Sequence, residues 1–190
     1  MSVMRRNIAA IFLSAAGLIG IAAYEGYTDR AVQPVPGDKP TYGFGSTTRA
    51  DGAPVRMSDA INPPAALALT GRDIALKEGT LKACFGDVML TQGEYDAYVS
   101  LAYNVGSAAV CRSSIPGKLR AGQYEAACES ILSFVKVQGR NCCATENKSF
   151  CGGICSRRQK EYQTCMGGAT DGNPTSQPET PRPPAGGNDA

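Results

Sequence analysis

The chain has 190 residues, a formal net charge of +2, eight cysteines and no histidine. This length predicts one domain of about 140–150 residues with additional segments at its ends. The low net charge argues against nucleic acid as a partner. The absence of histidine excludes Ser-His and Cys-His catalysis, so any acid–base chemistry has to come mainly from carboxylates.

A segment without charge follows a short basic start. Arg5 and Arg6 precede residues 8–23, which contain no charged side chain. Sixteen helical residues would span roughly 24 Å, less than the ~30 Å hydrocarbon core of a bilayer, and half of them are alanine or glycine. The segment predicts either a weak membrane helix with a cytoplasmic N-terminus or a signal peptide that is cleaved after the small residues at its end.

The stretch over residues 24–47 combines a lone acid with a glycine-rich strand. Glu25 follows the apolar segment after one residue, Tyr24, and burial favours the neutral form of a carboxyl, which a general acid requires. Asp38 lies in a turn rich in proline and glycine. The alternation that follows places Thr41 and Gly43 on one face of a strand, where a glycine leaves room for a ligand or another backbone. We therefore expect an acid at a helix end that faces a hairpin carrying a hydroxyl.

Two helices with local start signals are predicted next. Asn62 can cap a helix whose first turn tolerates the two prolines that follow, and this helix is expected to extend to about residue 83. Three apolar residues are expected near one face of it: Leu67, Ile74 and Leu81. Thr91 and Glu94 form a capping-box pattern that opens the second helix. Its aromatic residues Tyr95 and Tyr98 are interpreted as core.

The last third of the chain predicts two more helices separated by a loop. Apolar spacing indicates a helix over residues 123–137. Its buried stripe is expected to contain Ala127, Ile131 and Phe134. Residues 140–154 are rich in cysteine and glycine and predict a loop, after which Ser156 is expected to cap a final helix. Residues 167–190 contain five prolines and five glycines and predict a disordered tail.

The even number of cysteines in a short chain predicts disulfides and an oxidising compartment. Two long-range bonds are predicted: Cys128–Cys165 and Cys84–Cys111. The remaining four cysteines are expected to staple their own loop: Cys142, Cys143, Cys151 and Cys155. A zinc site made by these four is the alternative, but their spacing does not match paired zinc knuckles, so no metal or other cofactor is expected.

Three blocks of this sequence resemble the phage lysozymes, or endolysins, of the muramidase family that cleaves peptidoglycan. The first block contains Glu25 and the run over residues 41–47. The second covers residues 94–106, and the third covers residues 156–162. The blocks occur in the family's order and span most of residues 25–166. The resemblance implies an α+β lysozyme-like fold that is mostly helical, with a small β-hairpin lobe and with disulfide bonds.

The resemblance also implies roles for individual residues. Glu25 is the expected acid, and Thr41 is expected to place a water molecule. The aspartate that the family carries between them falls on Pro34 or Val35 here. Asp38 is the nearest carboxylate, and it either replaces that aspartate or only shapes the turn.

Further substrate-binding residues are implied around these three. Tyr103 and Asn104 are expected on the cleft wall, where Asn104 can hydrogen-bond a sugar amide, and Gly43 is expected to border the substrate. Arg157 or Arg158 is expected to hold Glu25 from the last helix. A solvated basic turn is the alternative for the two arginines.

The implied function is hydrolysis of the β-1,4 bond between N-acetylmuramic acid and N-acetylglucosamine, which lyses the host cell. The expected partners are peptidoglycan glycan strands and, through residues 8–23, the inner membrane, with no nucleic acid and a monomeric state. Residues 1–23 would form a signal-arrest-release segment, residues 24–166 the catalytic domain released to the periplasm, and residues 167–190 the tail. A secreted disulfide-rich binding protein of lysozyme fold without turnover is the alternative, which the missing aspartate favours.

Overall fold

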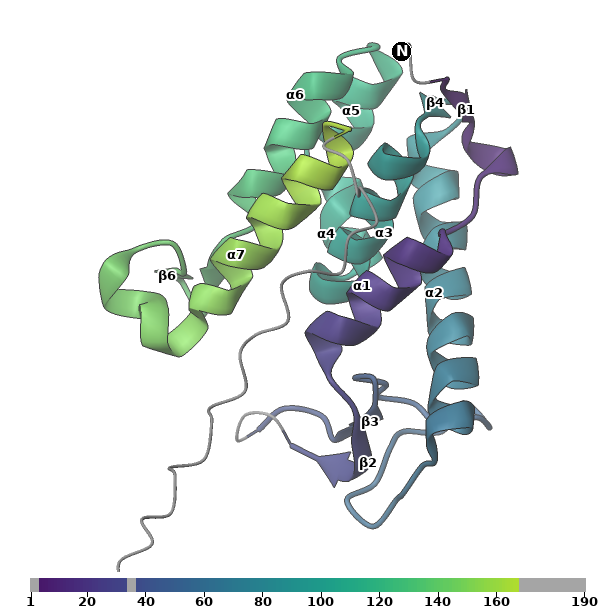
Figure 1. Cartoon of the computed structure of the whole chain (residues 1–190), viewed down its shortest axis with the longest axis vertical. Helices are drawn as coiled ribbons and strands as arrows, with labels where there is room; N and C mark the ends of the chain where they lie inside the picture. The colour runs from purple at the N-terminus through teal and green to yellow at the C-terminus, as the bar shows by residue number, and fades with distance from the viewer. Residues whose placement is uncertain (1–3, 34–36, 168–190) are drawn as a thin grey trace, which may run out of the picture.

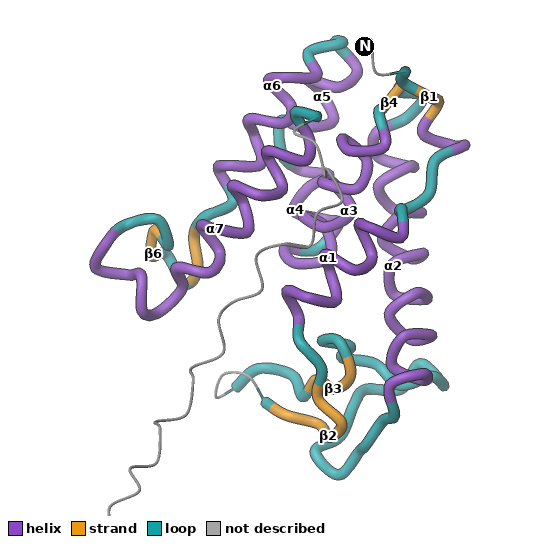
Figure 2. Tube along the Cα trace, in the orientation of Figure 1, coloured by secondary structure: helices purple, strands orange, loops and turns teal. Residues whose placement is uncertain are grey.

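Two lobes joined by one long helix make up the computed structural model, which describes residues 4–33 and 37–167 (Figure 1). The connecting helix is α2 (Pro63–Phe85). Helices dominate, and the short strands lie at the periphery (Figure 2). The predicted α+β class with a small hairpin lobe is therefore confirmed. The proline-rich turn over residues 34–36 and the predicted tail from residue 168 onward lie outside the described residues.

The N-terminal segment is built into the helical body. β1 (Arg6–Asn7) pairs antiparallel with β4 (Met89–Leu90), and a 3-10 turn follows at Ile8–Ala10. α1 (Ala15–Glu25) starts only after Ser14, whose hydroxyl accepts a hydrogen bond from the backbone of Gly17. Residues 8–23 thus do not form one continuous helix, because a capping serine interrupts them. Three isoleucines of the segment are buried in the main core: Ile8, Ile11 and Ile21.

The small lobe is a hairpin with its own apolar cluster. β2 (Thr28–Val32) and β3 (Thr41–Gly43) pair antiparallel, with Thr28 opposite Gly43 and Val32 opposite Thr41. The cluster under this hairpin consists of Ala31, Tyr42, Val55 and Leu69. Leu69 belongs to α2, so the long helix contributes its first turns to the small lobe and its later turns to the body.

The capping predictions for the two central helices are confirmed. Asn62 Oδ1 accepts from the backbone of Ala65 at 2.9 Å and caps α2. The capping box of Thr91 opens α3 (Gln92–Val105), and Tyr95 and Tyr98 are fully buried. Of the three apolar residues expected near one face of α2, Ile74 and Leu81 are buried, whereas Leu67 is 46% exposed. The hairpin lobe covers its neighbours Ala66 and Leu69 instead, because it contacts the adjacent side of α2.

The helix predicted over residues 123–137 ends early. α6 covers Tyr124–Glu129 and a 3-10 turn covers Ser130–Ser133, after which Phe134 leaves helical geometry with φ −85° and ψ 49°. The chain then forms a small hairpin of β5 (Lys136–Val137) and β6 (Arg140–Asn141). Two short helices precede this region: α4 (Ser107–Arg112) and α5 (Ile115–Arg120).

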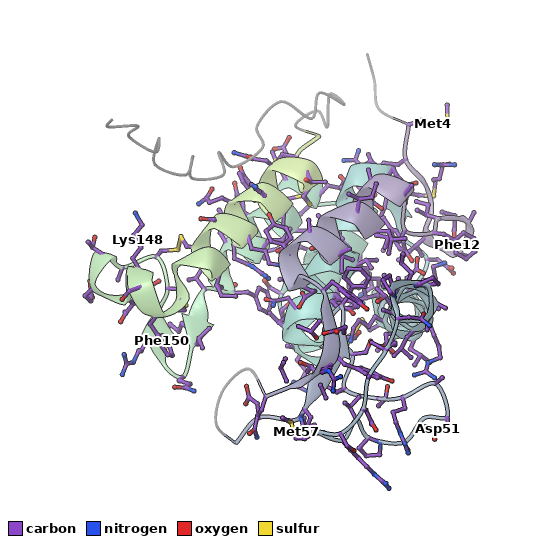
Figure 3. All side chains as sticks on the ribbon, turned by 60° about the horizontal axis from the view of Figure 1, so that its bottom comes forward. Met4, Phe12, Asp51, Met57, Lys148 and Phe150 are labelled. Atoms are coloured by element: carbon purple, nitrogen blue, oxygen red, sulfur yellow. A yellow bond between two sulfur atoms is a disulfide. The ribbon has the colours of Figure 1, made fainter. Side chains whose placement is uncertain are left out.

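The final helix begins earlier than predicted. α7 (Lys148–Cys165) follows a 3-10 turn at Thr145–Asn147 and has a kink at Cys151, so Ser156 lies within the helix and does not cap it. Two short-range disulfides hold this region: Cys142–Cys151 and Cys143–Cys155. These bonds fix a helical turn that the glycine-rich sequence does not indicate by its periodicity. Figure 3 shows Lys148 and Phe150 on this segment, at the edge of the molecule.

All eight cysteines form disulfides in this structure. Cys84–Cys111 joins α2 to α4, and Cys128–Cys165 joins α6 to α7. Both long-range pairings are therefore confirmed, as is the expectation that the other four cysteines bond within their own segment. The long-range bonds have sequence separations of 27 and 37 residues, and the first loop contains the buried helix α3. Both bonds restrict the conformations of the unfolded chain.

Candidate active site

A cavity of about 530 Å³ is bordered by both lobes. Glu25 reaches it from the end of α1, and residues 45–48 border it from the loop after β3. Asp73 and Lys77 line it from α2, and Asn104 lines it from the last turn of α3. The remaining lining residues are Leu76, Thr80, Tyr103 and Ser107. Most of these side chains are polar, which suits a hydrated ligand such as a sugar.

Glu25 has its two carboxylate oxygens in different surroundings. Arg157 Nη1 donates a hydrogen bond to Oε1 at 2.7 Å. Oε2 lies beside Gly45, where a Cβ atom would stand only 3.2 Å from it and where φ is +82°. A side chain at this position would press on the carboxylate and strain the backbone, so glycine is required here. One oxygen is thus held by a cation, and the other stays beside the cavity wall.

The predicted arginines are buried, so the alternative of a solvated basic turn is wrong. Arg157 holds Glu25, whereas Arg158 extends to Asn104 and donates from Nη2 to Oδ1 at 2.7 Å. Both guanidinium groups also contact Glu161 on the same helix. Burial lowers the pKa of the Arg158 guanidinium, and the charge of Glu161 acts in the opposite direction.

Tyr103 connects the two sides of the cavity. Its hydroxyl donates to the backbone carbonyl of Phe44 in the hairpin lobe at 2.9 Å. Burial raises the pKa of Tyr103 to about 12, and the negative charges of Asp73 and Glu25 add to the effect. The phenol therefore remains a hydrogen-bond donor at neutral pH, and it holds the loop after β3 against α3.

The structure does not bring every predicted residue into the cavity. The described residues that line it include neither Asp38 nor Thr41. Thr41 lies on β3, half-buried, opposite Val32 of β2. Asp38 is exposed in the turn, and its backbone carbonyl accepts a hydrogen bond from Gln33 Nε2 at 2.7 Å. Gly43 does not line the cavity either: a Cβ atom there would lie 3.0 Å from the Cβ atom of Ala66, so its small size lets α2 pack closely.

Sequence reasoning missed several polar residues at this site. Asp73 accepts a hydrogen bond from Ser46 Oγ at 2.7 Å, which ties α2 to the loop after β3. Ser100 and Glu161 bind each other and contact Arg157 behind Glu25. The spacing of Glu161, four residues after Arg157 and three after Arg158, was the available signal, because residues at these separations share a helix face. Within the described ranges, no cluster of three or more acidic or cysteine residues is placed to hold a metal ion.

Both the sequence and the fold have clear relatives. The family model described as Phage lysozyme matches residues 22–161. The endolysin of Acyrthosiphon pisum secondary endosymbiont phage 1 is 32% identical over 151 residues, which cover 78% of this chain and 94% of that protein.

Solved structures show the same fold. The endolysin from Escherichia coli O157:H7 phage FAHEc1 superposes with a TM-score of 0.68 at 27% identity, covering 84% of this chain and 96% of that one. The active form of the P1 phage endolysin Lyz superposes with a TM-score of 0.66 at 21% identity, covering 86% and 90% of the two chains. The lysozyme-like arrangement of lobes is therefore shared.

Proposed function

The chain belongs to the phage lysozyme family, whose endolysins are muramidase-type glycoside hydrolases that act on peptidoglycan, and on this basis we propose its bond specificity and mechanism. The proposed reaction is hydrolysis of the β-1,4 bond between N-acetylmuramic acid and N-acetylglucosamine, which lyses the host cell at the end of phage growth. One observation carries the mechanism: Glu25 lines the cavity with one oxygen bound to Arg157 and the other beside Gly45.

Glu25 is proposed as the general acid. When its carboxyl is protonated on Oε2, it can transfer that proton to the glycosidic oxygen while the bond from that oxygen to the anomeric carbon breaks. A water molecule then adds to the anomeric carbon and releases a proton to the solvent, and Glu25 takes up a proton from the solvent for the next cycle. Thr41, with or without Asp38, is proposed to orient this water. That assignment is supported by the family resemblance and by the hairpin that carries both residues.

Substrate binding is proposed to involve Asn104 and the ring of Tyr103, both of which line the cavity. Asn104 Oδ1 is occupied by Arg158, which can only donate, so the amide NH₂ group of Asn104 remains available for a carbonyl or hydroxyl oxygen of the sugar. Lys77 lies 5.2 Å from the Tyr103 ring and contributes a positive charge to the same wall.

The main test replaces Glu25 with glutamine. Glu25→Gln keeps an oxygen that can accept from Arg157, so the protein is expected to fold while losing its proton donor and its activity. Release of soluble fragments from purified peptidoglycan measures that activity, and circular dichroism measures folding. Glu129→Gln is the matched control, since Glu129 is exposed on α6 and loses the same charge.

Two outcomes would contradict this proposal. A folded Glu25→Gln protein that still cleaves peptidoglycan would move the chemistry to another residue. A folded wild-type protein that binds glycan strands without cleaving them would support the alternative of a binding protein with a lysozyme fold.

We also propose that the protein acts as a monomer in the periplasm and that residues 8–23 enter the inner membrane before they join the folded body. The lack of charge in these residues supports this, as does the exposure of Phe12 and Ile19, which are 67% and 69% accessible. In the part of the chain that the structure describes, no helix is both long and apolar enough to cross a membrane. The membrane-bound state would therefore require a different conformation of this segment.

A further inference from the structure

Glu161 carries a buried carboxylate that contacts both Arg157 and Arg158. The Glu161 side chain is 3% exposed. Its Oε1 accepts from Arg157 Nε at 3.1 Å and from Ser100 Oγ at 2.7 Å, while Oε2 lies 3.2 Å from Arg158 Nη1. Burial raises the pKa of the Glu161 carboxyl, whereas the two guanidinium groups and the Ser100 hydroxyl act in the opposite direction.

The two arginines that Glu161 contacts lead to different parts of the cavity. Arg157 continues to Glu25, the proposed acid, with 2.7 Å between Nη1 and Oε1. Arg158 continues to Asn104, the proposed sugar ligand, with 2.7 Å between Nη2 and Oδ1. Glu161 is therefore connected to Glu25 and to Asn104 through one arginine each, although it is not among the described residues that line the cavity.

Charge explains why this position needs a carboxylate. Arg157 and Arg158 are adjacent in sequence and both buried, so their like charges would repel each other in a medium of low dielectric. Glu161 compensates them jointly: its Oε1 accepts a hydrogen bond from Arg157, and its Oε2 forms an ion pair with Arg158 without hydrogen-bond geometry. Without that carboxylate, either arginine could turn toward the partners that remain, and the side chain it holds would move with it.

We propose that Glu161 is a positioning residue for the glycosidase reaction, which acts through Arg157 on Glu25 and through Arg158 on Asn104. It positions both the acid Glu25 and the sugar-binding amide of Asn104 without contacting the substrate. This inference rests on the proposed function of Glu25 and Asn104.

Glu161→Gln affects both connections, because it removes the ion pair with Arg158 and leaves Arg157 a neutral, weaker acceptor. The amide oxygen can still accept from Arg157 and Ser100, but its NH₂ group would face the donors of Arg158. On soluble peptidoglycan strands we expect KM to rise about 10-fold, because the displaced Asn104 loses its hydrogen bond to the sugar. We expect kcat to fall roughly 10- to 100-fold, because the acid is displaced slightly. Both constants are referred to the folded fraction measured by circular dichroism.

A double-mutant cycle with Asn104→Ala tests the route through Arg158. If Glu161 acts on binding through Asn104, Glu161→Gln is expected to raise KM clearly in the wild type and little in the Asn104→Ala background. A KM effect of equal size in both backgrounds would overturn the proposed route. A purely structural role would lower the melting temperature and leave both constants of the folded protein unchanged.

Three further variants complete the test. Glu161→Asp keeps the charge but withdraws it by one methylene, so we expect smaller changes of both constants in the same direction. It also provides the measurement if Glu161→Gln does not fold, and unchanged constants in Glu161→Asp would then overturn the proposal. Ser100→Ala removes only a neutral partner of Oε1 and is expected to have the smallest effect. Gln159→Ala, at an exposed position of the same helix, is the control.

Failure of the proposed function gives a different result. An inactive, folded wild-type protein would contradict the muramidase mechanism and would not by itself concern Glu161. The side-chain NH₂ resonances of Asn104 in NMR spectra report its position without turnover. A shift of these resonances in Glu161→Gln would support the connection through Arg158, and unchanged resonances would overturn it.

Discussion

The two oxygens of Glu25 have different neighbours, which give them different roles. Arg157 holds Oε1 at 2.7 Å, and the missing side chain of Gly45 leaves space at Oε2. The arginine fixes the orientation of the acid, and the glycine keeps the second oxygen accessible. At this scale the site depends as much on a residue without a side chain as on the charged ones.

Substitutions can distinguish the roles of Asp38 and Thr41 in orienting the water molecule. The Asp38 side chain is exposed and lies outside the cavity, and the bond from Gln33 goes to its backbone carbonyl, which alanine keeps. Asp38→Ala is therefore expected to change the free energy of unfolding by no more than about 0.5 kcal/mol and to keep most of the activity. Thr41→Ala is expected to lower kcat by roughly 100-fold if Thr41 orients the water. Urea unfolding and peptidoglycan hydrolysis check both variants. A 100-fold loss of activity in folded Asp38→Ala would instead make Asp38 the base.

Tyr103 predicts a change of stability at alkaline pH. Its pKa is raised to about 12 in the folded protein, so its phenol ionises first in the unfolded chain, near pH 10. The stabilising contribution of this group is therefore complete below about pH 10 and is lost between about pH 10 and 12.

Tyr103→Phe lacks this dependence. At pH 8 the variant is expected to be less stable by about 1 kcal/mol, since it loses the hydrogen bond to Phe44. The difference between the two proteins in urea unfolding is expected to shrink between pH 10 and 11. A constant difference over this range would contradict the assigned shift.

Among the elements, α1 is short and is held by polar contacts at both ends. At its start, Glu78 accepts from the backbone of Leu13 at 2.8 Å, and Asp96 accepts from the backbone and the hydroxyl of Ser14. At its end, Glu25 is bound to Arg157. Because only Ile21 of this helix is fully buried, these contacts set its position more than apolar packing does.

Asp96→Ala is therefore expected to loosen α1 and to displace the acid at its far end. We expect a loss of about 2–3 kcal/mol in the free energy of unfolding, since hydrogen bonds to a charged group are removed. Hydrogen exchange of the α1 amides is expected to accelerate more than exchange in α3. Asp87→Ala, at an exposed position before β4, is the control. Equal acceleration in both helices would show that α1 does not open independently.

At the scale of the whole molecule, the N-terminal segment has to fit the folded body even if it first enters a membrane. A Cβ atom at Gly17 would lie 2.6 Å from Leu13 and 3.1 Å from Asp96, whereas a Cβ atom at Gly20 would have no atom within 4 Å. A side chain at Gly17 therefore requires Leu13 and Asp96 to shift, whereas a Cβ atom at Gly20 meets open space.

Gly20→Leu tests the proposed release from the membrane. The substitution makes the segment more apolar with little cost to the fold, so the protein is expected to remain longer in the inner-membrane fraction and lysis is expected to start later. Cell fractionation and the onset of lysis measure this, and the melting temperature of the purified protein controls for folding. N-terminal sequencing of the soluble form has to start at the beginning of the chain. A start near Ala23 would show a cleaved signal peptide instead.

Local signals in the sequence determined much of the helical body. The caps at Asn62 and Thr91 each involve a side chain and a backbone group three residues apart, so the sequence alone is sufficient to predict them. The even number of cysteines was sufficient to predict that disulfides form, whereas eight cysteines leave many pairings open, and the fold decides which of them pair. Glu25 was identifiable because it is the first acid after a long apolar segment.

Contacts between distant segments decided the rest. Arg157 and Glu25 are 132 residues apart, and nothing in either neighbourhood specifies which of two adjacent arginines reaches the acid. The packing of α7 against α3 aims Arg157 at Glu25 and Arg158 at Asn104. Likewise, the approach of α2 requires the glycine at position 43, and the carboxylate of Glu25 requires the one at position 45. These assignments depend on how whole helices lie against each other, which a pattern of nearby residues does not contain.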